Sequence, residues 1–257
     1  MSARIDTEAS RAEVCVAACA DAWRGAGEVL ISPIGVVPAI GARLARATFA
    51  PQLLLSDGEA MLAAGVWPYG ERPPVVEGWL PYRSVFDLLW RGRRHVMMMP
   101  SQIDRHGNAN ISSIGADYQR PTVQLLGARG APGNTVNHPT SYWLPRHTRR
   151  SFVPRVDHVS GVGYDSAAAA GPAAERFMDL RRVVTNLAVL DFGGPDHSMR
   201  LVSVHPGVSR AEVEEATGFG LAGEAEPALT RTPSEEELRL IREAIDPHRA
   251  REGEVRS

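Results

Sequence analysis

The chain has 257 residues, of which 44% are hydrophobic and 23% are charged, and its formal net charge at pH 7 is −2. This length and apolar content suffice for a full core, in one large α/β domain or two small ones, and exclude a disordered or fibrous protein. The charge is close to neutral and the basic cluster Arg91-Gly92-Arg93-Arg94 is short, which argues against nucleic acid as a partner.

The first hundred residues alternate between helical and strand-like patterns. In chain order we expect a helix over residues 7–23, a strand over 28–32, a helix over 35–47, a strand over 52–56, a short helix over 81–90 and a strand over 95–99. Gly25 and Gly27 suit the left-handed geometry that ends the first helix. The alternation predicts an α/β fold with an open, mostly parallel sheet and helices on both faces.

The rest of the chain is less regular. Residues 100–138 are rich in Gly, Asn, Ser and Pro and predict surface loops, where α/β proteins often place ligand contacts. We expect strands over residues 152–160, 183–192 and 199–204, a short helix over 211–217 and a capped helix over 233–242, with a loop of small residues over 167–174. Glutamates 235–237 lie at the positive end of the last helix.

No metal site is expected. Cys15 and Cys19 lie four residues apart in the first helix and are interpreted as small buried apolar residues. His197 and His205 are interpreted as structural, because no second ligand lies at metal-site spacing around them.

The N-terminal residues lack an apolar signal core, and no apolar run approaches the roughly 20 residues that span a bilayer. We expect a soluble, cytoplasmic protein without a membrane segment.

Several short motifs are spread over nearly the whole chain. They are Gly41-Ala42-Arg43-Leu44-Ala45, Ser56-Asp57-Gly58, Gln102-Ile103-Asp104-Arg105-His106-Gly107-Asn108, Ser112-Ser113-Ile114-Gly115, Gly127-Ala128-Arg129-Gly130-Ala131-Pro132-Gly133, Thr217-Gly218-Phe219 and Leu240-Ile241-Arg242-Glu243-Ala244-Ile245-Asp246-Pro247. In these motifs and their order the chain resembles the beta subunits of class I coenzyme A transferases of the glutaconate CoA-transferase type. The resemblance implies that fold, as a single domain over residues 1–257.

Three signatures narrow the resemblance. They are the turn Ser56-Asp57-Gly58-Glu59, the loop Gly127-x-Arg129-Gly130-x-Pro132-Gly133-Asn134 and the run Asp191-Phe192-Gly193-Gly194-Pro195-Asp196-His197-Ser198-Met199-Arg200. With them the chain resembles most closely the beta subunits of the cholesterol ring-cleaving CoA hydrolases of steroid-degrading bacteria. This implies hydrolytic carbon–carbon cleavage of a cyclic β-keto-type acyl-CoA. It also implies a separate alpha subunit, expected as α2β2, and no cofactor, since CoA is part of the substrate.

The turn at Ser56 departs from the transferase pattern. In the transferases the matching strand ends in Glu-Ser-Gly or Glu-Asn-Gly, and that glutamate attacks the acyl-CoA. A serine hydroxyl is a weaker nucleophile unless a base activates it, and no Gly-x-Ser-x-Gly elbow surrounds Ser56. Ser56 is therefore a candidate substrate contact or a turn cap, and Asp57 a candidate catalytic residue or an ordinary turn residue.

The loop over residues 127–134 is the stronger candidate for chemistry. Glycines let the chain approach a ligand closely, and consecutive N–H groups can converge on one oxygen. The resemblance implies that this loop holds the thioester oxygen, here through the N–H groups of Arg129 and Gly130. The Arg129 guanidinium adds a fork for a substrate carboxylate, or serves as a structural ion pair.

The remaining candidates are polar residues expected to line the substrate pocket. They are Gln102, Asn134, Asn137 and His138. No residue of the chain stands out as a general base, so we expect the base to come from the alpha subunit. Two alternatives remain open: a true CoA transferase with Asp57 or Glu59 as its nucleophile, and a scaffold subunit that only stabilises a catalytic partner.

Overall fold

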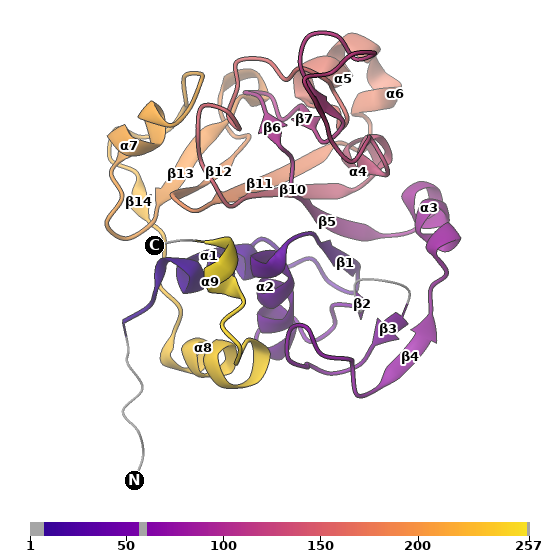
Figure 1. Cartoon of the computed structure of the whole chain (residues 1–257), viewed down its shortest axis with the longest axis vertical. Coiled ribbons are helices and arrows are strands. Elements are labelled where there is room, and N and C mark those ends of the chain that lie inside the picture. Colours follow the sequence, from indigo (N-terminus) through magenta and orange to yellow (C-terminus); the bar gives the residue numbers. More distant parts are fainter. Residues whose placement is uncertain (1–7, 57–60, 256–257) are drawn as a thin grey trace.

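A seven-stranded sheet forms the centre of the computed structural model, which describes residues 8–56 and 61–255 (Figure 1). Its strands, in spatial order, are β1 (Leu30–Pro33), β5 (Arg94–Met98), β10 (Pro139–Leu144), β11 (Asp179–Thr185), β12 (Ala188–Asp191), β13 (Arg200–Val204) and β14 (Ala228–Leu229). The pairs β1–β5, β5–β10, β10–β11 and β13–β14 are parallel, whereas β11–β12 and β12–β13 are antiparallel. The predicted α/β fold with a mostly parallel sheet is confirmed.

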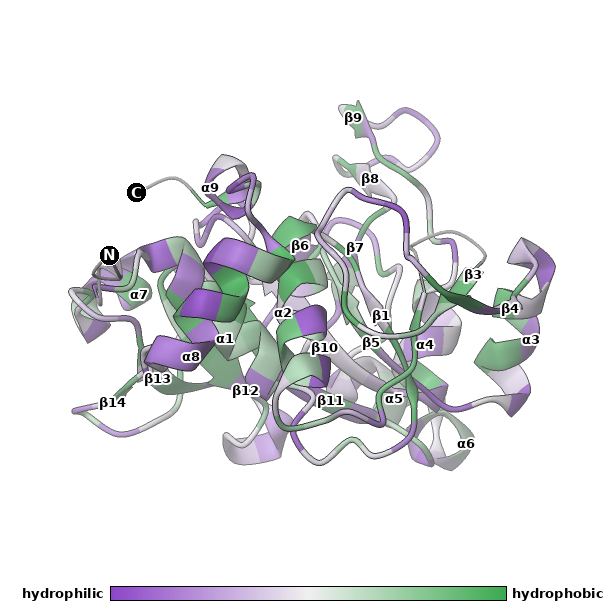
Figure 2. Ribbon diagram, turned by 90° about the horizontal axis from the view of Figure 1, so that it is seen from below, coloured by the Kyte–Doolittle hydropathy of each residue, from purple (hydrophilic) through white to green (hydrophobic). Residues whose placement is uncertain are grey.

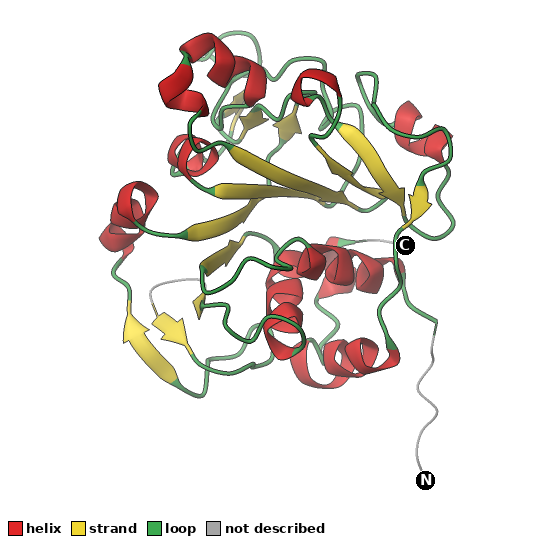
Figure 3. Cartoon of the chain, turned by 180° about the vertical axis from the view of Figure 1, so that it is seen from behind, coloured by secondary structure: helices red, strands yellow, loops and turns green. Residues whose placement is uncertain are grey.

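The two faces of the sheet are covered differently. Side chains alternate along a strand, so Met97 and Trp143 pack into one core, whereas Val96 and Tyr142 pack into another. The first core lies under α1 (Arg11–Asp21) and α2 (Val36–Ala47), joined by α8 (Glu235–Arg239), a π-helical turn (Leu240–Ile245) and α9 (Arg251–Glu254). The second face carries shorter helices and loops (Figure 3). Both faces of the sheet are buried, so the central strands direct apolar side chains into both cores.

The second face is assembled from short elements. They are α4 (Ala131–Asn137), α5 (Tyr164–Ala170), α6 (Pro172–Glu175), the 3-10 turn Pro195–His197, α7 (Arg210–Glu215), and the hairpins β6–β7 (Gln102–Ile103, Ala109–Asn110) and β8–β9 (Ser113–Ile114, Val123–Gln124). The β8–β9 hairpin projects from the body of the molecule (Figure 2).

A small antiparallel sheet lies beside β1. It contains β2 (Leu55–Ser56), β3 (Met61–Ala63) and β4 (Val76–Trp79), and α3 (Tyr82–Arg91) follows it. The strand expected over residues 52–56 is therefore only two residues long and lies outside the main sheet, which it touches through the single bridge between Leu30 and Leu54. Leu53 is fully buried in the helical core, which fixes the chain just before this strand.

Charged residues join the first helix to the end of the chain. The carboxylate of Glu13 is buried and accepts hydrogen bonds from Arg242 Nε at 2.8 Å and from Arg251 Nη2 at 2.9 Å. Arg251 also pairs with Asp246 at 2.8 Å. These guanidinium groups and the N–H of Ser10 outweigh the effect of burial and hold the pKa of Glu13 at about 2. The network fastens α9 and the π-helical turn onto α1.

Three expected elements are wrong. Residues 152–160 form no strand, because Pro154 has no N–H to donate and only Phe152 bridges to Ile103. The strand expected over 183–192 is two strands, since Thr185 Oγ1 accepts the N–H groups of Leu187 and Ala188 at 3.0 Å and closes a turn. The loop expected over residues 167–174 is helical, as its alanines favour.

Candidate functional site

The largest described cavity lies at the carboxyl end of β1 and has a volume of about 820 Å³. Its walls come from β1, the first turn of α2, Ser56 at the end of β2, and the start of α3. Ser56 is half-buried there. Asp57 and Glu59 lie outside the described residues, so the turn is defined only up to Ser56. The carboxyl end of a parallel strand is where α/β proteins commonly bind ligands.

The cavity wall at α2 is closed by a residue from the end of the chain. Gly35, the N-cap of α2, has φ +114° and no side chain that could cap the helix. Glu254 takes that role, because its carboxylate accepts the N–H of Val36 at 3.2 Å and of Val37 at 2.7 Å. The positive N-terminal end of α2 is therefore bound by the carboxylate of Glu254.

Two arginines also line the cavity, and they differ in their partners. Arg43 donates to the carbonyl oxygens of Trp67 at 3.1 Å and Ala39 at 2.9 Å, and its guanidinium lies 4.4 Å from the Trp67 ring centroid. Burial lowers the pKa of Arg43 to about 10. Arg94, the first residue of β5, has no hydrogen bond or ion pair with any described residue, and its Nε is buried without an acceptor.

The loop that precedes α4 has an unusual backbone. Arg129 adopts φ +48°, a left-handed conformation that favours glycine, and Gly127 adopts φ +88°. Gly130 is the N-cap of α4. The N–H groups of Arg129 and Gly130 find no acceptor in the described part of the chain. The Arg129 side chain is exposed. Two neighbouring peptide donors are therefore free at this loop.

The end of α4 places two of the candidate residues against α3 rather than in the cavity, and a third, Asn134, lies against β5. Asn137 Nδ2 and His138 Nε2 lie 3.1 Å and 3.2 Å from the carbonyl oxygen of Leu89. Burial and the positive charge of Arg94 lower the pKa of His138, which favours the neutral ring. Asn134 is buried; its Nδ2 contacts Met98 Sδ at 3.6 Å and its Oδ1 has no partner among the described residues.

Gln102 lies apart from these residues, in a network of its own. Its Oε1 accepts from Asn110 Nδ2 at 2.8 Å and from the N–H of Asp157 at 3.0 Å, while its Nε2 donates to Asp157 Oδ2 at 3.2 Å. The side chain is buried within this network. Its role as a substrate contact stays a prediction.

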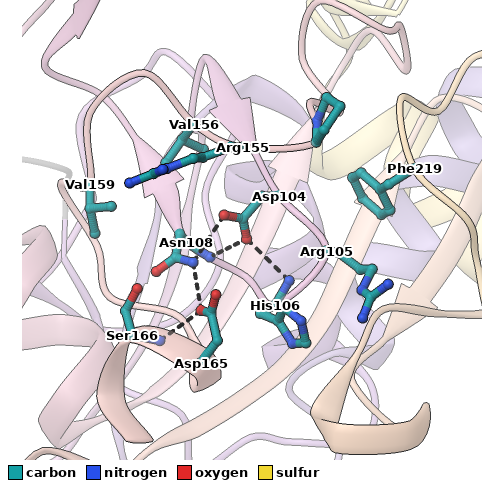
Figure 4. Close-up of a pocket in the computed structure, with 11 residues that line it drawn as sticks. Asp104, Arg105, His106, Asn108, Arg155, Val156, Val159, Asp165, Ser166 and Phe219 are labelled. Atoms are coloured by element: carbon teal, nitrogen blue, oxygen red, sulfur yellow. Dashed lines mark hydrogen bonds between the residues drawn. The ribbon is translucent and has the colours of Figure 1, made fainter. Parts of the chain in front are cut away.

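A second cavity, of about 530 Å³, surrounds the turn that follows β6 (Figure 4). Asn108 Nδ2 donates to Asp104 Oδ2 at 2.9 Å and to Asp165 Oδ1 at 2.7 Å, and Asp104 Oδ1 accepts the N–H of His106 and of Asn108. Gly107 supplies φ +86°. These polar groups hold the turn together, so a structural role explains them.

The cysteines and His205 take structural places. Cys15 and Cys19 are buried, and burial raises the pKa of Cys15 to about 12. His205 lies within hydrogen-bond distance of Thr230 Oγ1 and the carbonyl oxygen of Thr185. Over residues 8–56 and 61–255, no cluster of three or more His, Cys, Asp or Glu residues could hold a metal ion. Within those same ranges, every helix is too short or too polar to cross a bilayer.

Sequence reasoning missed Arg94 and Glu254 as cavity residues. Arg94 carries a signal in the sequence, because it is a charged residue separated only by His95 from the apolar run that begins at Val96. Glu254 carries no such signal in the sequence, because it is separated from Val37 of α2 by 217 positions. Only the folded structure brings it there.

Comparison with known proteins gives consistent results. No family model matches the chain. The chain is 55% identical over 249 residues to the cholesterol ring-cleaving hydrolase IpdB subunit of Rhodococcus jostii, covering 97% of each. It matches the crystal structure of Rhodococcus jostii RHA1 IpdAB with a TM-score of 0.93, over 98% of this chain and 100% of that chain.

More distant structures share the fold. Glutaconate coenzyme A-transferase from Acidaminococcus fermentans matches with a TM-score of 0.80 at 23% identity, over 95% of this chain and 97% of that chain. The class I CoA-transferase fold expected from the sequence motifs is confirmed.

Proposed function

The chain belongs to the family of the cholesterol ring-cleaving hydrolase IpdB subunits, and we propose that it is the beta subunit of a heteromeric acyl-CoA hydrolase that opens a steroid-derived ring. The observation that carries this proposal is the 55% identity to the Rhodococcus jostii subunit, which extends over 97% of both chains. The partner is an alpha subunit, in an α2β2 assembly. The enzyme acts in the cytoplasm without a cofactor, since CoA arrives as part of the substrate.

The reaction is a hydrolytic cleavage of the retro-Claisen type. Water adds to the ring ketone and loses a proton to a base. The ring bond between that carbon and the carbon beside the thioester then breaks. One fragment end becomes a carboxylate, and the electron pair moves into the thioester as an enolate, which is protonated on carbon. The enolate is accessible only where fixed donors meet its oxygen in a site that excludes bulk water.

The N–H groups of Arg129 and Gly130 are the donors we assign to that oxygen. Both are free of acceptors in the ranges that the structure covers, and the left-handed turn at Arg129 fixes their direction. Donors that are already oriented need no reorganisation when the charge develops. Asn134 follows in the next turn of chain, with an amide oxygen that lacks a partner in the described part of the molecule. Ser56, Asp57, Gln102, Asn137 and His138 complete the proposed substrate surroundings.

The general base is assigned to the alpha subunit. Glu254 is the carboxylate that lines the largest described cavity, and the N–H groups of Val36 and Val37 already bind it. These two hydrogen bonds engage the carboxylate as the cap of α2, so we do not assign it as the group that activates water. A base within reach of the attacking water is needed, and the interface between the subunits is the place where a partner side chain can supply it.

Labelled water tests the reaction. The purified two-subunit enzyme is incubated with a cyclic β-keto acyl-CoA in water enriched in oxygen-18, and the product and the intact protein are analysed by mass spectrometry. We expect one labelled oxygen in the new carboxylate and an unmodified beta subunit. An unlabelled product together with an acyl or CoA adduct on this chain would instead identify a transferase that uses Asp57 or Glu59.

A further inference from the structure

We propose that Leu89 of α3 is a positioning residue for the peptide N–H groups of Arg129 and Gly130, which it holds in place through α4. This inference rests on the proposed function, since it concerns the donors assigned there to the enolate oxygen. It also gives Asn137 and His138 a task that their sequence positions did not suggest, namely to fasten α4 to the backbone of α3.

The side chain of Leu89 lies against the first turn of α4. Leu89 is the buried residue of α3, whereas Tyr82 and Trp90 of the same helix are exposed. A methyl group added to Gly130 would lie 3.4 Å from Leu89 Cδ1, and one added to Gly133 would lie 3.4 Å from Leu89 Cβ. Both are contact distances, so Leu89 faces the backbone of α4 directly at these two glycines. The place of the donor turn therefore depends on this side chain.

The carbonyl oxygen of Leu89 binds the other end of α4. Leu89 lies in the last turn of α3, where carbonyl groups have no N–H partner within the helix. Asn137 Nδ2 lies 3.1 Å from this oxygen, and His138 Nε2 lies 3.2 Å from it. Burial lowers the pKa of His138, which favours the neutral ring, and Nε2 of that ring donates only as the nitrogen that bears the hydrogen. One residue of α3 therefore contacts α4 at both ends.

Backbone hydrogen bonds carry this anchorage along α4 to the donors. The N–H of His138 donates to the carbonyl oxygen of Asn134, and the N–H of Asn134 donates to that of Gly130, each at 2.9 Å. Gly130 is the N-cap of this short helix, so a shift of α4 against α3 would displace the donors by a similar distance. A misplacement of about 1 Å at a reacting centre can lower a rate about 100-fold.

Helix α3 also borders the cavity of about 820 Å³, which Tyr82 and Val85 line from its first turn. Its last turn holds Leu89 against α4. The same helix therefore contributes to both parts of the candidate site, and Leu89 is the residue that sets their separation. A role in folding alone would lower stability without a selective effect on the thioester, and the test uses this difference.

The first measurement is the infrared stretch of a thioester carbonyl. The probe is cyclohexanecarboxyl-CoA with carbon-13 in the thioester carbonyl, which lacks a ring ketone and is not opened. Bound to the wild-type heteromer, the stretch should move to lower wavenumber than in the free probe, because the two N–H donors polarise the carbonyl. Leu89→Ala should reduce that shift by about half or more. Leu88→Ala is the matched control, since Leu88 contacts Gly92 at the end of α3, and it should keep the shift.

The second measurement separates kcat from KM in the opening of a cyclic β-keto acyl-CoA. Donors that meet charge in the transition state act on kcat, so Leu89→Ala should lower kcat by roughly 10- to 100-fold and change KM by less than about threefold. Leu88→Ala should stay within about threefold in both constants. His138→Leu should also lower kcat, and His138→Gln, whose amide nitrogen takes the place of Nε2, should recover most of it. The two His138 variants carry the test if Leu89→Ala does not fold.

A lower kcat in Leu89→Ala with an unchanged carbonyl shift would overturn the proposal, as would equal losses in Leu88→Ala and Leu89→Ala. A wild-type enzyme that leaves the carbonyl stretch of the bound probe unshifted would overturn the donor assignment and this inference with it. If the wild-type enzyme shifts the carbonyl but opens no cyclic acyl-CoA, the proposed ring opening fails, whereas loss of the shift in Leu89→Ala would still support the role of Leu89.

Discussion

Arg129 shows how a single residue can combine a backbone role with an unfavourable conformation. Its φ of +48° costs a side chain with a Cβ atom about 1 kcal/mol relative to glycine. If the peptide N–H is its contribution, Arg129→Gly should keep kcat within about twofold and raise the free energy of unfolding by about 1 kcal/mol. Turnover and denaturant titration of the heteromer measure the two effects. A fall of tenfold or more in kcat would show that the guanidinium takes part.

Buried histidines give the protein an acid-sensitive fold. Burial lowers the pKa of His95 and His147 to about 3 and that of His205 to about 4, below the usual value of 6.5. Between these values the unfolded chain binds protons that the folded chain does not, so stability falls as the pH drops below about 6.5. We expect each of these buried histidines to lower the free energy of unfolding by about 2 kcal/mol at pH 5 relative to pH 7.

Denaturant titrations at pH 5, 6 and 7 measure that loss. His147 is the best residue to replace, because its two ring nitrogens lie 3.1 Å and 2.9 Å from the hydroxyls of Thr185 and Thr217. His147→Gln should lower stability at pH 7 and reduce the slope with pH. A slope that His147→Gln does not alter would contradict this account.

At the scale of elements, the sequence predicts those whose pattern is local. Helices α2, α3 and α7 and strands β5 and β13 agree with their expected ranges to within one or two residues. Strand β10 was not expected, because Thr140 and Ser141 interrupt its apolar pattern. Both are fully buried, and their hydroxyls are bound by groups distant in sequence or in the preceding turn, such as His95 Nε2 at 2.9 Å from Ser141. Tertiary contacts of this kind leave no local signal.

The cap of α2 is another element that only the folded chain explains. Glu254→Gln removes the charge that faces the helix N-terminus and one of its two acceptors, so we expect a loss of about 0.5–2 kcal/mol in stability. Glu252→Gln is the matched control, since Glu252 pairs with Arg249 at the surface and should change stability by less than about 0.5 kcal/mol. Equal losses of stability in the two variants would show that Glu254 does not stabilise the protein as the cap of α2. Thermal unfolding of both variants measures the difference.

At the scale of the whole molecule, the candidate site divides into a predicted part and an unpredicted part. The motif order identified the loop at Arg129, which precedes α4, and the turn at Ser56, which lines the cavity together with residues of α3. Gln102 belongs to a separate network, as its partners Asn110 and Asp157 show. The sequence could not reveal how these segments are arranged, because no motif specifies how α3 packs against α4 or how its first turn reaches the cavity at Ser56.

One surface of the molecule is apolar and exposed. Trp79 in β4 is 69% exposed, and Trp90 in α3 is 74% exposed, with Tyr82 and Phe86 on the same helix. Such patches mark protein interfaces. We expect the alpha subunit to cover this surface, so acrylamide should quench tryptophan fluorescence strongly in the isolated chain and weakly in the heteromer. Trp23, Trp67 and Trp143 are buried and provide the constant background. Equal quenching in both states would place the interface elsewhere.

The pairing of Glu13 with Arg242 has a consequence for biosynthesis. The two residues are separated by 229 positions, so the first helix waits for its counter-charge while almost the whole polypeptide is translated. At roughly 5–20 residues per second, that delay is about 10–50 s. During this interval the Glu13 carboxylate lacks the arginines that pair with it in the folded protein. Burying it without them is unfavourable, so the helix cannot yet pack in its final place. The first helix is therefore expected to dock only after the C-terminal residues have been synthesised, as a late step of folding.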